Sequence, residues 1–350
     1  MKIKTTKWVW CSALPLLFLI RFAHNNPNAI ENYYSRLLYP QVFELHQFFL
    51  NFIPFSFGDV LYIGFILYGL KIVLKRISFW KAKPIQLFFD FGSFVIITAW
   101  IFHLSWGFNY HRIPLNEQLA ITISYSKQDL EERLDKLIQQ SNHWHDQLVT
   151  SDTAAVEFPL TKDQTQEKVS LYSPFYRETL LNIARVKKSL LSLPLSYMGY
   201  SGYLNPFTLE SQVNTKMPLM SQITTSFHEA AHQLGYASEK EANFIAYISA
   251  IKNNDPYIKF AGYTFASKYL YYELYKIDPE AARAKLKLLN PGILKNLREV
   301  SDFWKKYENP FEVIFDKTYD EYLKANGQKS GIKSYHEMVG LVINYHKNDA

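Results

Sequence analysis

Cysteine is nearly absent from this sequence, because Cys11 is the only one among 350 residues. A single thiol excludes an internal disulfide framework and any zinc or iron–sulfur site that is built from several cysteines. Glycine and proline are also sparse, at 13 and 15 residues, which excludes a collagen-like chain or a low-complexity linker. Because 48% of the residues are hydrophobic, the chain can bury a core and is not a disordered tail.

Acidic residues are scarce in the first third of the chain. Residues 1–112 hold 11 Lys and Arg against four Asp and Glu, a net charge of +7, whereas residues 113–350 hold 27 against 28, a net charge of −1. A nucleic-acid-binding face would cluster its bases on a soluble domain, but here the bases flank apolar runs. The net charge of +6 therefore does not predict binding to nucleic acid.

Three apolar stretches in the basic third predict transmembrane helices at about 6–23, 55–74 and 87–108. A helix needs about 20 mostly apolar residues to cross a bilayer, and the second and third stretches reach that length. The first stretch is shorter, and the lysines that precede it also resemble the start of a signal peptide. Because no small-x-small cleavage site follows it, a retained membrane anchor is the preferred interpretation.

The distribution of bases predicts how these helices cross the membrane. The first seven residues carry three lysines, and the link at about 75–86 carries four bases, whereas the link at about 24–54 has one arginine against two glutamates. The positive-inside rule then places the N-terminus and the second link in the cytoplasm. Residues 113–350 would form an extracytoplasmic domain of a multi-pass protein in the cytoplasmic (inner) membrane.

Apolar residues recur with helical spacing along most of residues 113–350. This pattern predicts a mainly α fold for the last two-thirds of the chain. A helix is expected to start at Ser126, another to cover 174–191, and a last one to cover 335–345. The segment 196–217 is rich in Tyr, Gly and Asn, which favours a short hairpin or edge strands.

The residues that carry chemistry form the pattern H-E-x-x-H, from His228 to His232. Positions four apart lie on one face of a helix, so both imidazoles can reach one metal ion. Glu229 projects beside that ion, where it can polarise a bound water. Gly235 stands where a glycine that ends a helix belongs.

A third metal ligand is expected in the next helix. Ser238 and Glu241 have the spacing of a capping box, so a helix should begin there, with Glu239 in its first turn. A zinc site with two histidines needs a third protein ligand and leaves one position for water. Glu239 is the predicted ligand. Glu241 is the alternative and ranks second, because the capping box would already use its carboxylate. Asn243, one turn after Glu239, could orient a ligand histidine.

A zinc hydrolase also needs a donor that stabilises the oxyanion of the transition state. Tyr335 is the candidate for this role, with His336 and Tyr322 as alternatives. Glu210 and Asn214, in the predicted hairpin, are interpreted as structural polar residues and not as catalytic ones.

The stretch from His228 to Asn243 resembles the gluzincin metallopeptidases. In that group a glutamate of the following helix is the third zinc ligand, and the residue four positions later holds a ligand histidine. Glu239 and Asn243 match this pattern, with Asn where Asp is commoner. The resemblance implies a zincin-like α+β domain in which an edge strand lies beside the substrate, and 200–214 is the candidate strand.

Most of the chain also resembles an uncharacterised bacterial membrane protein family, a domain of unknown function, in 202–208, 228–244, 322–328 and 334–335. That family implies no activity. The zinc motif implies a membrane-anchored zinc metallohydrolase, most simply a peptidase that acts on a peptide or protein. The alternative is a catalytically silent zinc-stabilised module that binds a partner, although such a module would not need Glu229. An intramembrane protease is disfavoured, because polar residues flank the motif.

Overall fold

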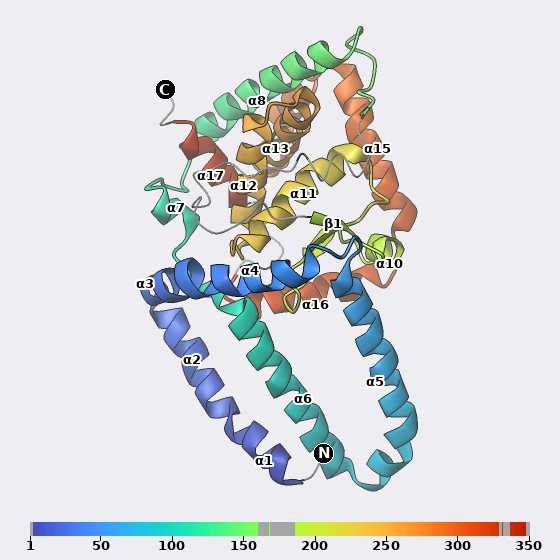
Figure 1. The fold of residues 1–350 in the computed structure, drawn as a ribbon. Coiled ribbons are helices and arrows are strands. Elements are labelled where there is room, and N and C mark those ends of the chain that lie inside the picture. The colour runs from blue at the N-terminus through green and yellow to red at the C-terminus, as the bar shows by residue number, and fades with distance from the viewer. Residues whose placement is uncertain (1–2, 160–167, 169–185, 329–330, 332–336, 348–350) are drawn as a thin grey trace. The chain divides into compact units, whose positions relative to one another are not determined.

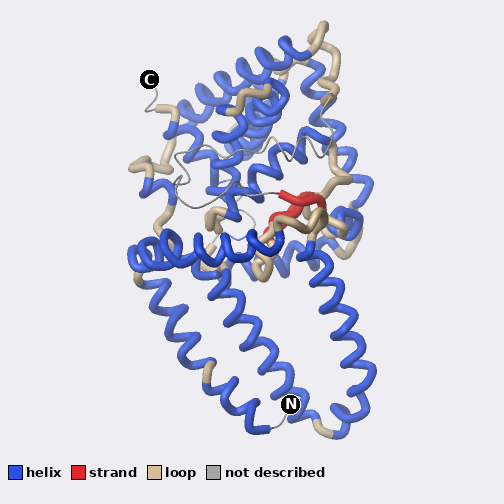
Figure 2. The backbone as a smooth tube through the Cα atoms, in the orientation of Figure 1, coloured by secondary structure: helices blue, strands red, loops and turns tan. Residues whose placement is uncertain are grey.

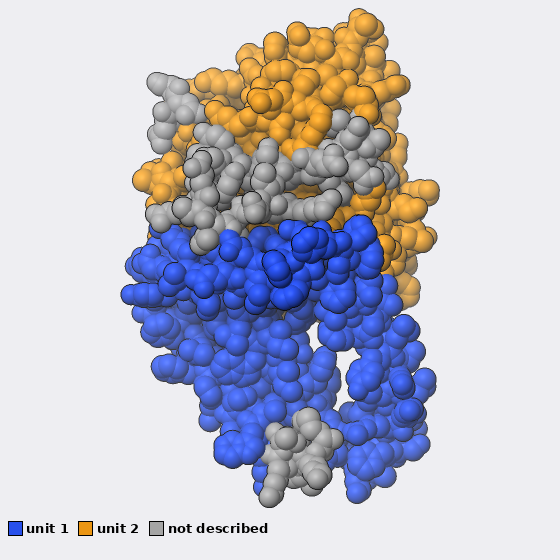
Figure 3. Space-filling model, in the orientation of Figure 1, with its two compact units in different colours: residues 1–113, 205–210 blue, residues 114–204, 211–350 orange. Residues whose placement is uncertain are grey.

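The computed structural model describes residues 3–159, 168, 186–328, 331 and 337–347. The chain divides into two compact units, which Figure 3 distinguishes by colour. Unit 1 comprises residues 1–113 and 205–210, and unit 2 comprises residues 114–204 and 211–350. Helices dominate the described residues, as Figure 2 shows, which confirms the predicted mainly α fold.

Unit 1 consists of helices that follow one another with short links. In chain order they are α1 (Ile3–Cys11), α2 (Ala13–Asn25), α3 (Pro27–Ala29), the π-helix η1 (Ile30–Leu38), α4 (Tyr39–Leu50), α5 (Phe57–Ala82), α6 (Pro84–Ser105) and the 3-10 helix η2 (Gly107–His111).

Two of these helices, α5 and α6, are long and apolar enough to cross a membrane, judged by length and composition. Only 11% and 6% of their most apolar windows are buried within the protein, whereas the core helix of a soluble protein is mostly buried. The predicted spans at 55–74 and 87–108 therefore correspond to two long apolar helices with exposed side chains.

The first apolar stretch differs from the prediction of one helix over 6–23, because it is divided into α1 and α2 at Ser12. Pro15 explains the division. Its nitrogen carries no hydrogen, and its ring clashes with the carbonyl four residues earlier. That carbonyl belongs to Cys11, the last residue of α1. Neither piece alone is as long as α5 or α6.

Polar side chains hold the ends of α5 and α6. The first N–H groups and last carbonyls of a helix have no partner inside it. The Glu210 carboxylate accepts hydrogen bonds from the backbone N–H groups of Phe57 (3.3 Å) and Gly58 (2.6 Å) at the start of α5. The Tyr34 hydroxyl donates to the carbonyls of His103 (3.2 Å) and Leu104 (3.1 Å) at the end of α6. Glu210 is thus a structural residue, as predicted.

Unit 2 is built from helices and one small sheet (Figure 1). Its elements are α7 (Leu115–Gln118), α8 (Lys127–Leu148), β1 (Val186–Lys188), α10 (Ser192–Tyr197), β2 (Gly202–Leu204), β3 (Ser211–Val213), α11 (Leu219–Gln233), α12 (Glu239–Lys252), α13 (Pro256–Ile277), α14 (Pro279–Leu286), α15 (Pro291–Tyr307), α16 (Glu312–Ala325) and α17 (Met338–Tyr345).

The core of unit 2 lies where α8, α11, α12 and α13 pack together. Nearly every residue of helices α11 and α12 is buried, and Phe227 and Phe244 are fully buried. A helix that is buried all round occupies the centre of a domain. The H-E-x-x-H helix is therefore a central element of unit 2.

The small sheet has the order β1-β3-β2, in which β1 pairs with β3 in parallel and β2 pairs with β3 in antiparallel fashion. Gly202 is opposite Val213, and Leu204 is opposite Ser211. The predicted edge strands within 196–217 are confirmed, with β2 at one edge. The Ser211 hydroxyl donates to the carbonyl of Glu229 at 2.6 Å, which fixes β3 against α11.

The predicted helix over 174–191 is wrong where its residues are described, because Val186–Lys188 is the strand β1. Its pairing with β3, more than 20 residues later, decides its conformation, and such tertiary context overrides local propensity. The short helix α10 follows and contains Pro194.

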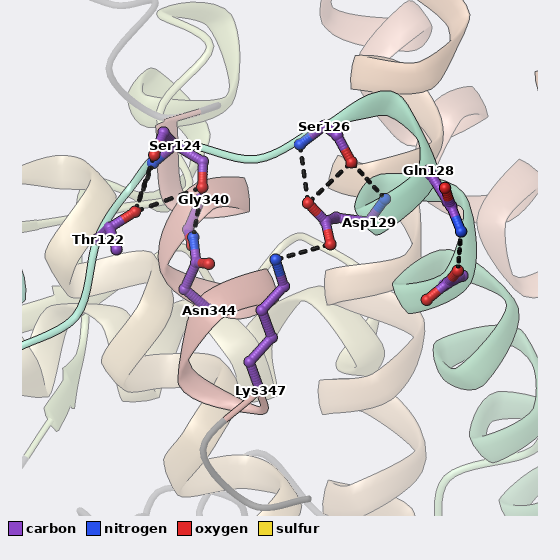
Figure 4. Close-up of polar contacts among 9 residues, drawn as sticks. Thr122, Ser124, Ser126, Gln128, Asp129, Gly340, Asn344 and Lys347 are labelled. Carbon is purple, nitrogen blue, oxygen red and sulfur yellow. Dashed lines mark hydrogen bonds and ion pairs between the residues drawn. The ribbon is translucent and has the colours of Figure 1, made fainter.

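The predicted start of α8 is confirmed. Ser126 and Asp129 exchange hydrogen bonds in a capping box, which Figure 4 shows. The last helix, α17, packs against α8. Lys347 forms an ion pair with Asp129 (2.6 Å), and Asn344 donates to the carbonyl of Ser124 (3.0 Å). These contacts fasten the C-terminal helix to the core of unit 2.

Candidate metal centre

Helices α11 and α12 bring the predicted ligand side chains together. The Nε2 atoms of His228 and His232, one turn apart on α11, are 3.0 Å from each other. Glu239 is the first residue of α12, and its Oε2 lies 3.1 Å from His228 Nε2 and 3.5 Å from His232 Nε2. All three residues are buried, and they form a group that could hold a metal ion.

The turn between α11 and α12 positions this group. Gly235 has a φ of +81°, a left-handed conformation that glycine adopts without strain, and it ends α11 where the sequence predicted. The Tyr236 N–H returns to the carbonyl of Ala231 at 3.2 Å. The chain therefore reverses tightly enough for Glu239 to reach the two histidines.

Each histidine ring is oriented by an oxygen on its far side. His228 Nδ1 lies 2.8 Å from Asn243 Oδ1, and His232 Nδ1 lies 2.7 Å from the carbonyl oxygen of Tyr236. Because both partners accept hydrogen bonds, each Nδ1 donates a hydrogen bond to its partner, which leaves each Nε2 as the ring atom that can bind a metal ion beside Glu239. Asn243 thus stands where the sequence predicted, whereas the backbone partner of His232 was not predicted.

The spacing of the three ligand atoms suits zinc. Tetrahedral bonds of about 2.0–2.1 Å place ligand atoms about 3.3 Å apart. The three distances here are 3.0, 3.1 and 3.5 Å. Oε2 of Glu239 is also buried without a hydrogen-bond partner among the described residues. A buried oxygen of this kind is satisfied when it binds a cation.

The charges of the group favour a cation at this place. Burial raises the pKa of Glu239, but His232 and His228 outweigh it and hold that pKa well below its usual value. Burial lowers the pKa of His232, yet the attraction of the Glu239 carboxylate prevails and raises it to about 9. A carboxylate that stays ionised in this buried place therefore attracts positive charge.

Glu229 lies next to the group on α11 and is also buried. Its Oε2 has no hydrogen-bond partner among the residues that the structure describes. Burial and the nearby Glu239 raise its pKa to about 7, although the two histidines act in the opposite direction. A carboxyl group with a pKa near neutrality can both accept and return a proton.

The edge strand β2 approaches Glu229 at Gly202. A Cβ atom at Gly202 would lie 2.8 Å from Glu229 Oε1 and 2.6 Å from the carbonyl oxygen of Gln212. Only glycine permits this approach of the backbone to a side chain. The sequence offered a signal for this residue, since a glycine inside a strand often marks such a contact.

The second predicted candidate for third ligand, Glu241, faces elsewhere. Its Oε1 accepts a hydrogen bond from the backbone N–H of Leu115 at 2.7 Å. The predicted capping box is wrong, because the Ser238 side chain makes no cap hydrogen bond, although α12 does begin after Ser238. Glu241 is thus used to fix the start of α7, and it does not join the histidine group.

Two residues that the sequence did not predict hold Glu239. The Tyr319 hydroxyl, from α16, donates to Glu239 Oε1 at 2.7 Å. The side-chain oxygen of Gln328 accepts from the Glu239 N–H at 3.2 Å, and its nitrogen donates to the carbonyl of Ala237 at 3.2 Å. No local pattern pairs residues that are 80 or more positions apart.

Of the three predicted oxyanion-stabilising candidates, the structure describes Tyr322 alone. Tyr335 and His336 lie outside the described residues. Tyr322 is stacked on Tyr319, with ring centroids 5.9 Å apart and an interplanar angle of 18°. Asn214 donates to the hydroxyl of Ser196 at 3.0 Å, so it holds the hairpin together as predicted.

A family described as "Protein of unknown function (DUF3810)" matches residues 34–343. The chain belongs to the DUF3810 family. The DUF3810 match contains His228, His232, Glu239 and Tyr319, so the whole group lies inside the family domain. Neither a curated protein nor a solved structure matches the chain.

Proposed function

We propose that this DUF3810 protein is a membrane-anchored, zinc-dependent hydrolase, most simply a peptidase. The observation that carries the proposal is the buried group of His228, His232 and Glu239 beside Glu229, in which two carboxylate oxygens have no hydrogen-bond partner among the described residues. The proposed reaction uses both oxygens: Oε2 of Glu239 would bind the metal ion, and Oε2 of Glu229 would accept a proton from water.

The chain's own residues perform the proton transfers in this proposal. His228, His232 and Glu239 would hold zinc, which when bound acts as a Lewis acid and lowers the pKa of water. Glu229 takes the proton of the attacking water as general base and returns it to the leaving amine as general acid. Its pKa of about 7 suits both steps.

A peptide substrate would be bound in extended form along β2. An extended peptide can add to the edge of a sheet through main-chain hydrogen bonds, and β2 is an edge strand of the small sheet. The absence of a side chain at Gly202 brings the backbone of β2 close to Glu229. A substrate on β2 would therefore have its backbone near the general base.

Two other functions are less well supported. In a catalytically silent zinc module, Glu229 would be a buried carboxyl group whose Oε2 lacks a hydrogen bond among the described residues. Such a group destabilises the fold, and a silent module would have no function for it. In an intramembrane protease, the H-E-x-x-H helix would itself cross the bilayer. The candidate spans among the described residues are α5 and α6, and α11 has only 15 residues.

The proposal includes an orientation in the cytoplasmic membrane. The first apolar stretch, α5 and α6 would cross the bilayer, with the N-terminus in the cytoplasm and residues 113–350 outside. A reporter enzyme fused after residue 350 tests this orientation. An extracytoplasmic signal is expected, and a cytoplasmic signal would overturn it.

Metal analysis tests the zinc site. The full-length protein in detergent should contain one zinc ion per chain, and His228→Ala should lose it while circular dichroism still reports a helical fold. A folded wild type without zinc, or a His228→Ala variant with unchanged metal content, contradicts the proposal.

The Glu229→Gln variant tests catalysis. It should keep its zinc and lose about 10²- to 10⁴-fold of activity, because a general base contributes about that much. New protein termini would be counted in cells that make the wild type or the variant. If Glu229→Gln preserves function in cells while His228→Ala abolishes it, the silent binding module is the correct interpretation.

A further inference from the structure

Helix α4 of unit 1 presents a row of large apolar side chains that no described part of unit 1 covers. We propose that α4 and the residues up to Phe55 lie flat in the outer headgroup region of a lipid bilayer. This inference rests on the membrane anchoring in the proposed function and adds a second, different contact with the lipid.

The connections of unit 1 place this segment at one end of the apolar helices. Only Lys83 separates α5 from α6, and Figure 1 shows that these helices run in opposite directions. The start of α5 and the end of α6 therefore lie at the same side of unit 1. η1, which precedes α4, is tied to the end of α6 through Tyr34. Gln47 of α4 donates to the carbonyl of Leu209 at 3.4 Å, next to the residue that caps the start of α5.

Figure 1 shows α4 running crosswise to α5 and α6 within unit 1. Its 12 residues are about 18 Å long at 1.5 Å per residue, whereas the hydrocarbon core is about 30 Å thick. Helix α4 is therefore too short to cross the bilayer. Its position and direction are those of a helix in the plane of the interface.

The two faces of the segment differ in what they contact. Tyr39 and Phe43 are buried within the protein, at 0% and 1% exposure. The opposite face leaves Phe48 67% and Phe52 82% exposed. The large apolar residues exposed on this segment are Leu45, Phe48, Phe49, Phe52 and Phe55. A contiguous apolar patch of this kind marks an interaction surface.

Charge identifies the partner as lipid. Residues 37–57 contain one acid, Glu44, and no Lys or Arg. By contrast, the 17 residues of helix α15 in unit 2 include six charged ones, as is usual for a water-exposed helix. Phe and Leu on one face of a helix beside transmembrane segments suit insertion about 5–10 Å into the boundary between headgroups and acyl chains.

Depth-dependent quenching tests the inference. Single cysteines would replace Phe52, Ile66 in α5 or Ser301 in α15 in a Cys11→Ser background, each labelled with a small environment-sensitive fluorophore. The full chain is placed in phosphatidylcholine–phosphatidylglycerol vesicles that carry nitroxide lipids, either shallow or deep. The Phe52 label should be quenched at least about twofold more by the shallow nitroxide, in keeping with an interfacial depth.

The two reference positions separate the possible failures. The Ile66 label should be quenched most by the deep nitroxide, and the Ser301 label by neither. If Ile66 is quenched and Phe52 is not, the interfacial helix is wrong and the membrane anchor stands. If Ile66 is not quenched either, the anchoring in the proposed function fails, and the inference fails with it.

A second measurement guards against an effect of the label. The unlabelled Phe52→Cys thiol should react with a membrane-impermeant maleimide at least about tenfold more slowly than the Ser301→Cys thiol, because lipid disfavours the thiolate. Equal rates would overturn the inference. The Phe52→Cys thiol could instead react slowly at a rate that depends on protein concentration, while its label is not quenched by nitroxide lipids. That result would assign the surface to a second copy of the chain and would also overturn the inference.

Discussion

Both units bury glutamates, but the carboxylates are bonded differently. In unit 1, Glu31 accepts hydrogen bonds on both oxygens, from Arg36 (2.7 Å) and Arg112 (2.9 and 3.0 Å). Glu210 likewise receives two backbone N–H groups on its two oxygens. In unit 2, Glu229 and Glu239 each keep one buried oxygen that has no hydrogen-bond partner among the described residues.

This difference separates carboxylates that the fold pairs fully from those to which the proposed function gives a role. A buried charge without partners costs several kcal/mol, so a fold normally provides partners for each oxygen. Glu31 follows that rule, and the arginines outweigh the burial that raises its pKa, so the pKa falls below its usual value. In the proposed function, the oxygens of Glu229 and Glu239 that lack a hydrogen-bond partner among the described residues are the ones that would serve a water and a metal ion.

The largest effect is expected when the two first-turn glutamates of α12 are compared. Glu239→Gln should weaken zinc binding by more than about 100-fold, because a metal ligand matters more than the outer-shell partners whose loss costs about 10–100-fold. Glu241→Gln should leave it unchanged, because a glutamine oxygen can still accept from Leu115. Zinc titration against a competing chelator measures both variants.

The reverse result would exchange the roles of these two glutamates. Zinc lost by Glu241→Gln and kept by Glu239→Gln would mean that the ligand is misassigned. Circular dichroism of both variants shows whether either loss is merely unfolding.

In unit 1, Glu31→Gln should reduce stability and leave zinc binding intact. Glu31 is 1% exposed, and breaking a buried ion pair costs about 3–5 kcal/mol because the partner charge is left uncompensated. Thermal unfolding in detergent measures the loss. A matched Asp90→Asn variant removes the more exposed pair with Arg76 and should cost at most about 1 kcal/mol. Equal losses of stability in Glu31→Gln and Asp90→Asn would refute the structural role assigned to the buried Glu31 pairs.

Tyr319→Phe probes the bond that orients Glu239. Removing the hydroxyl should weaken zinc binding by about 10- to 100-fold and leave the fold intact, since the ring still stacks on Tyr322. Tyr200→Phe is the control, because that hydroxyl donates to the carbonyl of Phe315 at 3.5 Å and not to a carboxylate. Equal zinc affinities in both variants would show that Tyr319 only packs.

The part of the site that could be predicted is the part that is local in sequence. His228 and His232 are one helical turn apart, and Glu239 and Asn243 follow within the next helix, so spacing alone groups them. Tyr319 and Gln328 reach Glu239 from 80 and 89 positions away, and only the packed structure brings them there. The missed residues are those whose position depends on tertiary packing.

The same distinction holds for the fold. The apolar runs that became α5 and α6 could be recognised from composition, because their exposed side chains need no partner within the protein. The prediction of a helix at β1 is wrong because the conformation of β1 depends on its pairing with β3, which the local sequence of β1 does not indicate. The division between α1 and α2 depends on Pro15, a local signal that was present in the sequence.

The smallest effect is expected at the edge strand. Gly202→Ala would place a methyl group 2.6 Å from a backbone carbonyl that cannot easily move, and 2.8 Å from Glu229. Overpacking of this kind costs about 1–3 kcal/mol, so β2 and Glu229 should separate slightly. Activity should fall about tenfold while zinc affinity is unchanged, because Glu229 is displaced and the ligands are not. A loss of zinc with activity per bound zinc preserved would instead show that β2 supports the ligand group, and the separate role of Glu229 would lose its support.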